Sequence, residues 1–502
     1  MSVINGHANR RQVSTRNAPR KPFQPDVGGG GRYPFALVSA ALVLVTLSEG
    51  VLIGVVPSAV AGIGTLLHVS AGSLNWIITV QLVATGVCTP VFSRLGDIRG
   101  HRQILRAAVL LTAVGGVLMA VAPNFTLLLT GRALQGPADS FTPLAIGILR
   151  TQADTGRLRR GIAALITGEA TGAGLGLLAA AEVYRATDSV RDVLWIPAAC
   201  SAAAAAVAFA FVPETRWRAR LRMDWLGAAS LSAGLAVLLL ALASGAGWGW
   251  ASGRTVGTLT ASVVLLGAWV AVELRAADPL INLRAMSRRA VAPFYLAGLP
   301  LGVAFFGGAT ATATFLAASK RASGYGFDLD VTAIAYVGLV SASAAVLGAM
   351  VVPRLVKRIG HRPTVCAGCV ALLAGNTGLA IRHDALWQVV AANSAISLGI
   401  GLAASAMAML LTERADTSST GISVGMYLTV RAVGGSMAGA GFAALLTRVT
   451  IVGTSVPREW AYMAVWLTCG LASLLALIIV AASRLNDHRA TQPAQRAEGA
   501  AG

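Results

Sequence analysis

Three carboxylates stand within long apolar stretches of the sequence, at Glu49, Asp139 and Glu169. An ionisable residue in such a stretch is a functional candidate, because charge in a hydrocarbon environment is costly. A poorly hydrated cavity favours the protonated form of a carboxyl, and a nearby arginine favours the ionised form. These residue types therefore predict a relay that takes up and releases protons.

Arg132 shares a predicted helix with two further polar residues. Arg132, Gln135 and Asp139 recur at i, i+3 and i+7, which places them on one helical face that must point away from lipid. By helical rise, Asp139 and Glu169 are expected at a similar distance from the cytoplasm, with Glu49 and Arg132 nearer the outside. Arg132 and Glu49 then either take part in proton coupling or form a fixed structural pair.

Arg431 has no acidic residue within the apolar stretches that surround it. Two interpretations remain open: Arg431 pairs with Glu169 or Asp139 in the other part of the chain, or it holds an anionic group of a substrate. Asp139 and Glu169 also have a second interpretation each, as polar groups that bond a neighbouring helix.

The remaining residue types disfavour other chemistries. The five Cys lie in apolar stretches, and Cys366-x-x-Cys369 has neither a second pair nor a His partner, so it predicts helix packing rather than a metal site. The six His fall in predicted tails or loops, whereas an intramembrane metal site needs them in the helices. The sequence lacks G-x4-G-K-[ST], so ATP is not expected as the direct energy source. We predict no metal, no cofactor and no enzyme activity.

Composition identifies the elements that must position these residues. Of 502 residues, 55% are hydrophobic and 12% are charged, against roughly a quarter charged in soluble domains. The hydrophobic residues fall in blocks long enough to cross a bilayer as helices. We predict an all-α integral membrane protein with fourteen transmembrane helices, near 34–66, 74–93, 104–122, 125–149, 161–183, 193–212, 225–244, 255–273, 291–316, 331–352, 364–381, 386–411, 421–446 and 460–483.

The basic residues predict the orientation. With a cytoplasmic N-terminus, the inner segments hold 30 of the 40 Lys and Arg residues, the outer loops hold 8, and Arg132 and Arg431 lie within spans. Cytoplasmic loops of membrane proteins carry such an excess of Lys and Arg. We predict a multi-pass protein of the cytoplasmic membrane with both termini inside the cell and disordered tails at 1–32 and 485–502.

A short pattern repeats at an offset of 260 residues. Residues 93–102 read S-R-L-G-D-I-R-G-H-R, residues 353–362 read P-R-L-V-K-R-I-G-H-R, and Gly161-Ile162 recurs as Gly421-Ile422. We predict two homologous six-helix halves, at 33–213 and 275–484, with two inserted helices at 214–274. Internal repeats are typical of transporters that rock about a central site.

Spans 2 to 5 hold three short motifs. Their residues are Asp97, Gly100 and Arg102 after span 2, Arg132, Gln135 and Gly136 in span 4, and Gly161, Gly168, Gly172 and Gly176 in span 5. Their order and spacing resemble the signatures of the major facilitator superfamily, and in particular of its fourteen-span drug:proton antiporters. His101 departs from the signature, which has a basic residue at that position.

This resemblance implies a role for each motif. Asp97, Gly100 and Arg102 would form a cytoplasmic gate of salt bridges and helix-end contacts. The span 4 element is associated with proton coupling in the superfamily. The span 5 glycines form the antiporter-type motif and let helices approach closely. The predicted proton-coupling residues are Glu49, Arg132, Asp139 and Glu169.

Aromatic residues of the ninth span belong to the predicted substrate cavity. Phe305 and Phe306 lie near Thr residues in a span without charge, and aromatic surface with a few hydroxyls suits a lipophilic small molecule. Helix packing or lipid contact is an equally open interpretation for each ring. We place Gln135 and Arg431 in the same cavity.

These patterns predict proton-driven export of a small lipophilic drug, antibiotic or secondary metabolite. Uptake or facilitated diffusion of a small nutrient by the same fold is the alternative. A membrane-embedded enzyme or receptor is disfavoured because no loop is long enough for an appended domain. The expected partners are a small-molecule substrate and the lipid bilayer, without nucleic acid, and the expected state is monomeric.

Overall fold

The computed structural model describes residues 34–483 except 70, 214–222, 277–278, 282, 287–290, 416–419 and 452–455. The predicted tails lie outside the described residues. The helices, which are α-helical apart from the 3-10 segment η1, are α1 Phe35–Leu67, α2 Ala71–Arg99, α3 His101–Val121, α4 Phe125–Leu134, η1 Gly136–Ser140, α5 Phe141–Arg150, α6 Thr155–Thr187, α7 Val190–Phe211, α8 Trp225–Trp248, α9 Gly253–Arg275, α10 Leu283–Met286, α11 Ala292–Ala317, α12 Lys320–Ser323, α13 Val331–Ile359, α14 His361–Ile381, α15 Leu386–Arg414, α16 Thr420–Arg448 and α17 Glu459–Ala482.

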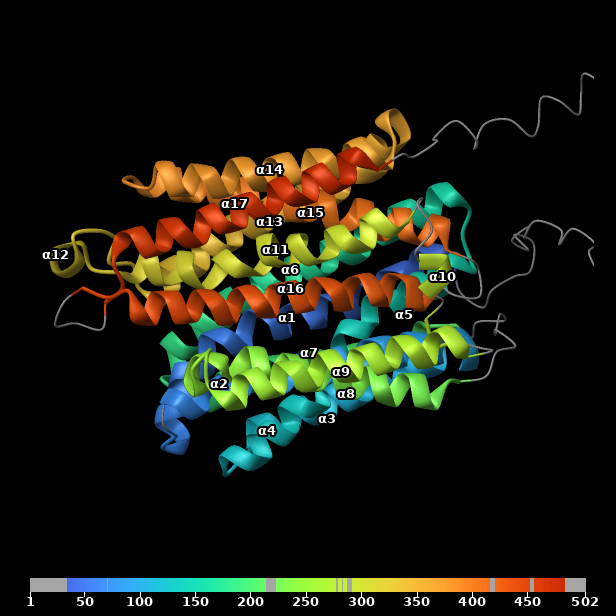
Figure 1. Ribbon diagram of the computed structural model, residues 1–502, viewed down its shortest axis with the longest axis horizontal. Coiled ribbons are helices and arrows are strands. Elements are labelled where there is room, and N and C mark those ends of the chain that lie inside the picture. Colours follow the sequence, from blue (N-terminus) through green and yellow to red (C-terminus); the bar gives the residue numbers. More distant parts are fainter. Residues whose placement is uncertain are drawn as a thin grey trace, which may run out of the picture.

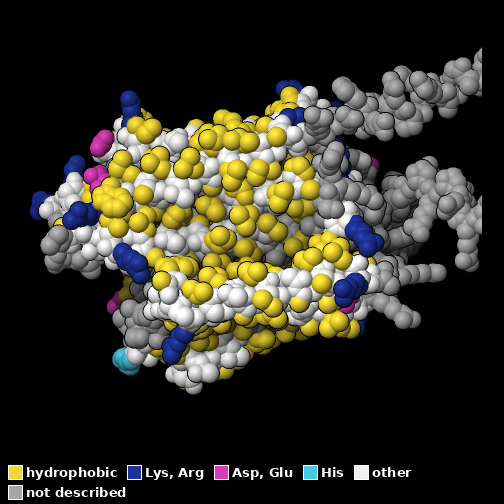
Figure 2. All heavy atoms as spheres, viewed as in Figure 1, with side chains coloured by type: hydrophobic (Ala, Val, Ile, Leu, Met, Phe, Trp, Pro, Cys, Tyr) yellow, Lys and Arg dark blue, Asp and Glu magenta, His cyan; other side chains and the backbone are white. Residues whose placement is uncertain are grey.

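The helices form a bundle with an apolar flank. Among the described residues, twelve helices are long and apolar enough to cross a membrane. Hydrophobic side chains cover the flank of the molecule, and the Lys and Arg side chains gather towards its two ends (Figure 2). Neither α2 nor the segment from α4 to α5 is among the twelve, so the predicted total of fourteen spans stays a prediction.

The bundle repeats its helix pairings in two halves. In the first half α1 packs on α6 and α7, and α3 packs on α7; in the second half α11 packs on α16 and α17, and α14 packs on α17. The halves meet where α6 contacts α13 and where α2 contacts α16, and the pair α8–α9 packs beside α2 and α16 through α8. All the long helices run along the length of the bundle, with α12 at one end and α10 at the other (Figure 1). The exact domain boundaries stay predictions.

The predicted fourth span is not one continuous α-helix. It consists of α4, the 3-10 segment η1 and α5. Pro137 lies in the first turn of η1, and proline lacks the backbone N–H that a continuing α-helix needs. The i, i+3, i+7 spacing of one continuous α-helix therefore does not extend to Asp139, and the common face stays a prediction.

The glycines of α6 form a close contact with α1. A Cβ atom added at Gly172 would lie 2.1 Å from the carbonyl oxygen of Leu47, and one at Gly176 would lie 2.8 Å from that of Val51. Gly168 likewise faces the backbone of α1, whereas Gly161 faces the side chain of Leu149 in α5. Small residues allow this approach of two backbones.

Replacement of Gly172 by alanine is expected to destabilise the protein by about 2 kcal/mol, because overpacking must separate α1 from α6. Gly257→Ala in α9 is the matched control, since nothing lies within 4 Å of a Cβ atom at that position and alanine favours a helix. Thermal unfolding of both variants in detergent measures the difference. Equal midpoints for Gly172→Ala and Gly257→Ala would contradict the prediction.

Candidate central charge cluster and interhalf contacts

Four charged residues from both halves lie in the middle part of the bundle. Glu49, Glu169 and Arg431 lie near the middle of α1, α6 and α16, and Asp139 lies in η1, between α4 and α5. We call them the central charge cluster. Glu49 interacts electrostatically with the other three, and Arg431 with all three carboxylates. Glu49 is only 4% exposed, and the hydroxyl of Thr142 donates a hydrogen bond to its Oε2 at 3.5 Å. Three carboxylates of the first half thus face one arginine of the second.

Arg132 lies beside this cluster, not against Glu49. Its guanidinium donates to the carbonyl oxygen of Ile77 at 3.1 Å, to Gln135 Oε1 at 2.7 Å and to the side chain of Gln81. Its electrostatic partner is Asp139. Within the described part of the chain no ion pair joins Arg132 to Glu49, so the expected fixed pair between these two residues is not formed.

The depth expected for Glu49 was also wrong. Glu49 lies near the middle of the 33-residue helix α1. A Cβ atom at the next residue, Gly50, would lie 2.0 Å from the carbonyl oxygen of Glu169, so the two carboxylate positions are level. The start of α6 explains the difference. α1 begins within one residue of its predicted start, but α6 begins at Thr155 instead of residue 161, so Glu169 lies further along its helix than the predicted span implied.

Arg431 packs among three aromatic rings. Its guanidinium carbon lies 5.6 Å from the ring centroid of Phe305, 5.4 Å from that of Phe306 and 6.0 Å from that of Tyr427, within the range of cation–π attraction. No carboxylate among the described residues lies within ion-pair distance of Arg431. Its interaction with the carboxylates across the halves is therefore electrostatic without direct contact.

The predicted cavity residues are only partly brought together. Phe305 is buried and Phe306 is 45% exposed, both beside Arg431. Gln135 is fully buried and bonded to Arg132 instead. Tyr427 was missed, although it precedes Arg431 by one helical turn, a spacing that places two side chains on the same face.

Asp97 lies where α2 ends and α16 begins, which we call the Asp97 end of the bundle. It is 1% exposed, and its two carboxylate oxygens accept hydrogen bonds from the N–H groups of Gly421 and Ile422, each at 3.1 Å. Free N–H groups at a helix N-terminus favour an anion. Gly100 separates α2 from α3 with a φ of 109°, which favours glycine. Arg102 is half-buried in the first turn of α3.

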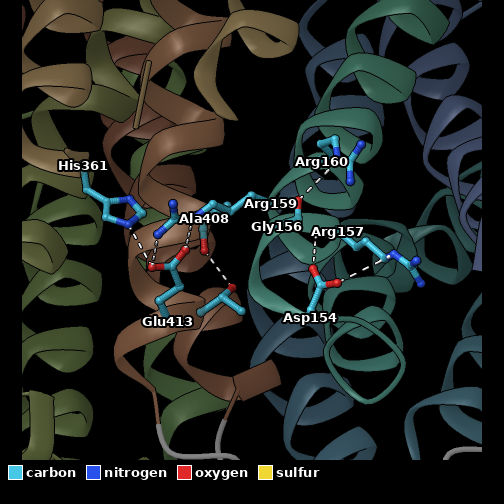
Figure 3. Close-up of polar contacts among 9 residues, drawn as sticks. Asp154, Gly156, Arg157, Arg159, Arg160, His361, Ala408 and Glu413 are labelled. Atoms are coloured by element: carbon cyan, nitrogen blue, oxygen red, sulfur yellow. Dashed lines mark hydrogen bonds and ion pairs between the residues drawn. The ribbon is translucent and has the colours of Figure 1, made fainter. Parts of the chain in front are cut away.

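Glu413 forms a second contact between the halves at this end. It lies in α15 and not in the predicted loop. Arg159 of α6 donates to its two oxygens at 2.6 and 2.9 Å, and His361 Nε2 lies 3.0 Å from its Oε2. Figure 3 shows both side chains directed at the carboxylate of Glu413. Sequence reasoning missed this pair, which joins residues 254 positions apart.

The Asp97 end is thus closed by several bonds between the halves. Arg150 of α5 adds hydrogen bonds to the carbonyl oxygen of Ala415 at 2.8 Å and to Thr420. At the opposite end, the described contacts between the halves include a bond from the Tyr336 hydroxyl to Glu182 at 3.3 Å. In the ranges that the structure describes, no group of three or more His, Cys, Asp or Glu side chains is placed to hold a metal ion.

The sequence profile of the Major Facilitator Superfamily matches residues 38–439, which is most of the chain. This chain belongs to the Major Facilitator Superfamily. It is therefore a multi-pass membrane transporter, as the sequence motifs predicted.

Curated transport proteins match this chain over short stretches. The efflux pump dotC of Dothistroma septosporum is 29% identical over 103 residues, which is 20% of this chain and 18% of that protein. The uridine/deoxyuridine transporter of Lactococcus lactis is 31% identical over 86 residues, 17% of this chain and 18% of that protein. The matches thus span about a fifth of each relative and do not select a substrate.

Two solved transporters show the same fold. The human organic anion transporter MFSD10 superposes with a TM-score of 0.63 at 15% identity, over 89% of this chain and 98% of that one. The nucleoside transporter NupG superposes with a TM-score of 0.55 at 12% identity, over 90% of this chain and all of NupG. At these identities the likeness extends to the fold alone.

Proposed function

We propose that this transporter exports a small lipophilic drug, antibiotic or secondary metabolite across the cytoplasmic membrane in exchange for protons. The observation that carries the proposal is the central charge cluster, in which three carboxylates of one half face Arg431 of the other. The described spans of the second half hold acidic residues only at helix ends, at Glu413 and Glu459. Proton transfer through the middle of the bundle then depends on the carboxylates of the first half.

The two-half arrangement supplies a mechanism for coupling. When the halves rock, Arg431 moves relative to Glu49, Asp139 and Glu169. A cation that approaches a protonated carboxyl favours loss of its proton, and withdrawal of the cation favours uptake. Protons enter from outside, bind at the carboxylates and leave to the cytoplasm as the cluster rearranges. The proton gradient is then the only energy source, without a cofactor.

The rings beside Arg431 support a lipophilic substrate. Phe306 offers a partly exposed aromatic face next to buried Phe305 and Tyr427, and ligand sites combine such surfaces with a few polar groups. The efflux pump among the relatives favours export. The uridine/deoxyuridine transporter favours the alternative, uptake of a small nutrient, but the proton-binding carboxylates and the close α1–α6 contact resemble the antiporters.

We place the Asp97 end in the cytoplasm, because the described basic runs at the end of α2, the start of α6 and the end of α13 lie there. Asp97, Gly100 and Arg102 then belong to a cytoplasmic gate, and the closed Asp97 end corresponds to an outward-facing state. The transporter works as a monomer in the bilayer, with a small molecule and no nucleic acid as its partner.

Reporter fusions test this orientation. Fusions after Arg222, Arg289 and Arg489, which lie outside the described residues, are expected to report the cytoplasm, and fusions after Arg254 and Lys320 the outside. The expectation follows from the excess of Lys and Arg in the inner segments. Reversed readings at two of these five positions would mean that a span has been misplaced.

The experiment that tests the function is flux in proteoliposomes with an imposed pH gradient. With the cytoplasmic face of the protein outward, an acidic lumen should drive accumulation of an exported compound, and a protonophore should abolish it. A panel of lipophilic dyes and antibiotics is compared with nucleosides and other polar nutrients. Transport of nutrients alone, or a flux that does not change with the pH gradient, would overturn the proposal.

A further inference from the structure

Two carboxylates lie at one end of the helix pair α8–α9. Asp224 is the N-cap residue of α8, and Glu273 lies two residues before the end of α9. Arg94, which precedes Asp97 in α2, donates to the carbonyl oxygen of Pro279 at 2.9 Å, just after α9. Asp224 and Glu273, which we call the α8–α9 carboxyl pair, are therefore at the Asp97 end, outside the central charge cluster.

One oxygen of each carboxylate faces the same point. A Cβ atom added at Gly227 would lie 2.4 Å from Asp224 Oδ2 and 2.8 Å from Glu273 Oε2. Both oxygens are buried and have no hydrogen-bond partner among the described residues. The other two oxygens are bonded: Asp224 Oδ1 accepts from the N–H of Gly227 at 2.8 Å, and Glu273 Oε1 from that of Ile281 at 2.5 Å. The absence of a side chain at Gly227 thus lets the two unbonded oxygens converge.

The surroundings do not balance two negative charges at this point. Glu273 is only 3% exposed, and within the described part of the chain neither carboxylate forms an ion pair. Arg94 acts on Glu273 electrostatically, but less than Asp224 does. Arg284 of α10 donates to the carbonyl oxygen of Leu274 at 3.2 Å. Two carboxylates that share a buried site cannot both ionise without a large cost in free energy.

Trp269 adds a buried donor to this site. It precedes Glu273 by one helical turn, so the two side chains lie on the same face of α9. Its indole nitrogen is near enough to the Glu273 carboxylate to affect its charge. Trp269 is 6% exposed, yet its Nε1 has no hydrogen bond of ordinary geometry to any described residue. One buried donor and two buried oxygens, all without partners, therefore meet at the foot of α8 and α9.

We propose that Asp224 and Glu273 bind one proton between them, and that this proton holds α8 and α9 together at the Asp97 end. The proton bonds the converging oxygens to each other and removes the repulsion between two charges. The bond from the Ile281 N–H to Glu273 extends the site to the segment that leads from α9 towards α11. Loss of the proton then loosens the start of α8 and this segment together. The site is separate from the carboxylates proposed to drive transport.

Hydrogen exchange of the full-length protein in lipid nanodiscs, followed by mass spectrometry, tests this site without substrate. The amide of Ile281 reports the contact with Glu273. The folded protein retains a proton here that the unfolded chain has released, so the stability of the contact falls as the pH rises. Relative to Asp224→Asn at the same pH, wild-type exchange at Ile281 should be similar at about pH 6 and about tenfold faster at about pH 9.

Asp224→Asn is the reference because its amide supplies the shared hydrogen bond at every pH. Asparagine keeps an oxygen for the N–H of Gly227 and places an NH₂ group where it can donate to Glu273. Asp330→Asn is the matched control. Asp330 also caps its helix, α13, through Oδ1 and the N–H of Ala333 at 2.9 Å, but its side chain is exposed. Asp330→Asn should retain the pH dependence of the wild type at Ile281.

The same pH dependence at Ile281 in the wild type and in Asp224→Asn would overturn the proposal. Glu273→Gln is the reciprocal variant, whose amide donates to Asp224, and it decides the question if Asp224→Asn does not fold. Protection that returns at the higher pH when sodium chloride replaces choline chloride would indicate a metal cation and overturn the shared proton. Failure of proton-driven efflux in proteoliposomes would leave these results intact, so the two proposals fail separately.

Discussion

Replacement of Asp97 by asparagine is expected to reduce the transport rate about 30-fold, which corresponds to about 2 kcal/mol. The carboxylate satisfies two N–H groups at the start of α16 and a histidine ring. Asparagine keeps one acceptor oxygen and turns an NH₂ group towards a donor, so at least one bond and the favourable charge at the helix N-terminus are lost. Initial rates of substrate flux, normalised to the protein present in proteoliposomes, measure the effect.

Lys357→Ala provides the matched control for this prediction. Lys357 occupies the equivalent position of the sequence repeat, but its side chain is exposed. Its replacement should change the rate less than about twofold, as for exposed charges in general. Comparable losses from Asp97→Asn and Lys357→Ala, with normal insertion of both, would show that Asp97 has no special role.

Glu49→Gln is expected to abolish uphill efflux driven by a pH gradient. Glu49 is the most buried of the three carboxylates, and it interacts with both others and with Arg431. Glutamine keeps the size and the hydrogen-bonding capacity of the side chain but cannot titrate, so substrate affinity should change less than about fivefold. Counterflow, which needs no net proton movement, should persist. Flux with and without the pH gradient and equilibrium binding give the comparison.

Asp139→Asn and Glu169→Gln are the companion variants. Both carboxylates are half-buried and are expected to alter substrate range or affinity more than coupling. If uphill transport proceeds at the normal rate in all three single variants, the carboxylate model is wrong and a uniporter becomes the better interpretation. If Glu169→Gln alone abolishes coupling, the proton site lies on α6 instead of α1.

Local sequence patterns predicted the fold, because the length, apolarity and glycine spacing of a segment can be read from that segment alone. A helix long and apolar enough to cross a bilayer must satisfy its own backbone, whatever its neighbours are. The glycines at 168, 172 and 176 likewise predicted a close helix contact, since only small residues permit one. The repeat between residues 93–102 and 353–362 indicated the two halves.

Which residues lie together in the candidate site depends on how the helices pack against one another, and a local sequence pattern does not contain that information. The 3-10 segment at Gly136–Ser140 interrupts the helix before Asp139, so the α-helical periodicity counted from Arg132 does not continue to that residue. Arg132 donates hydrogen bonds to Ile77 and Gln81 of α2 and does not pair with Glu49.

By itself, the sequence determined that this chain is a helical transporter of two related halves, with ionisable residues buried among its spans. The tertiary structure decided which residues interact: Glu49 electrostatically with Asp139 and Glu169, Arg431 with three aromatic rings, and Glu413 with Arg159. Helical periodicity fixes the direction of a side chain relative to its own helix. The offset and rotation of one helix against another arise from packing along their whole contact, and those two quantities select the partner of each buried charge.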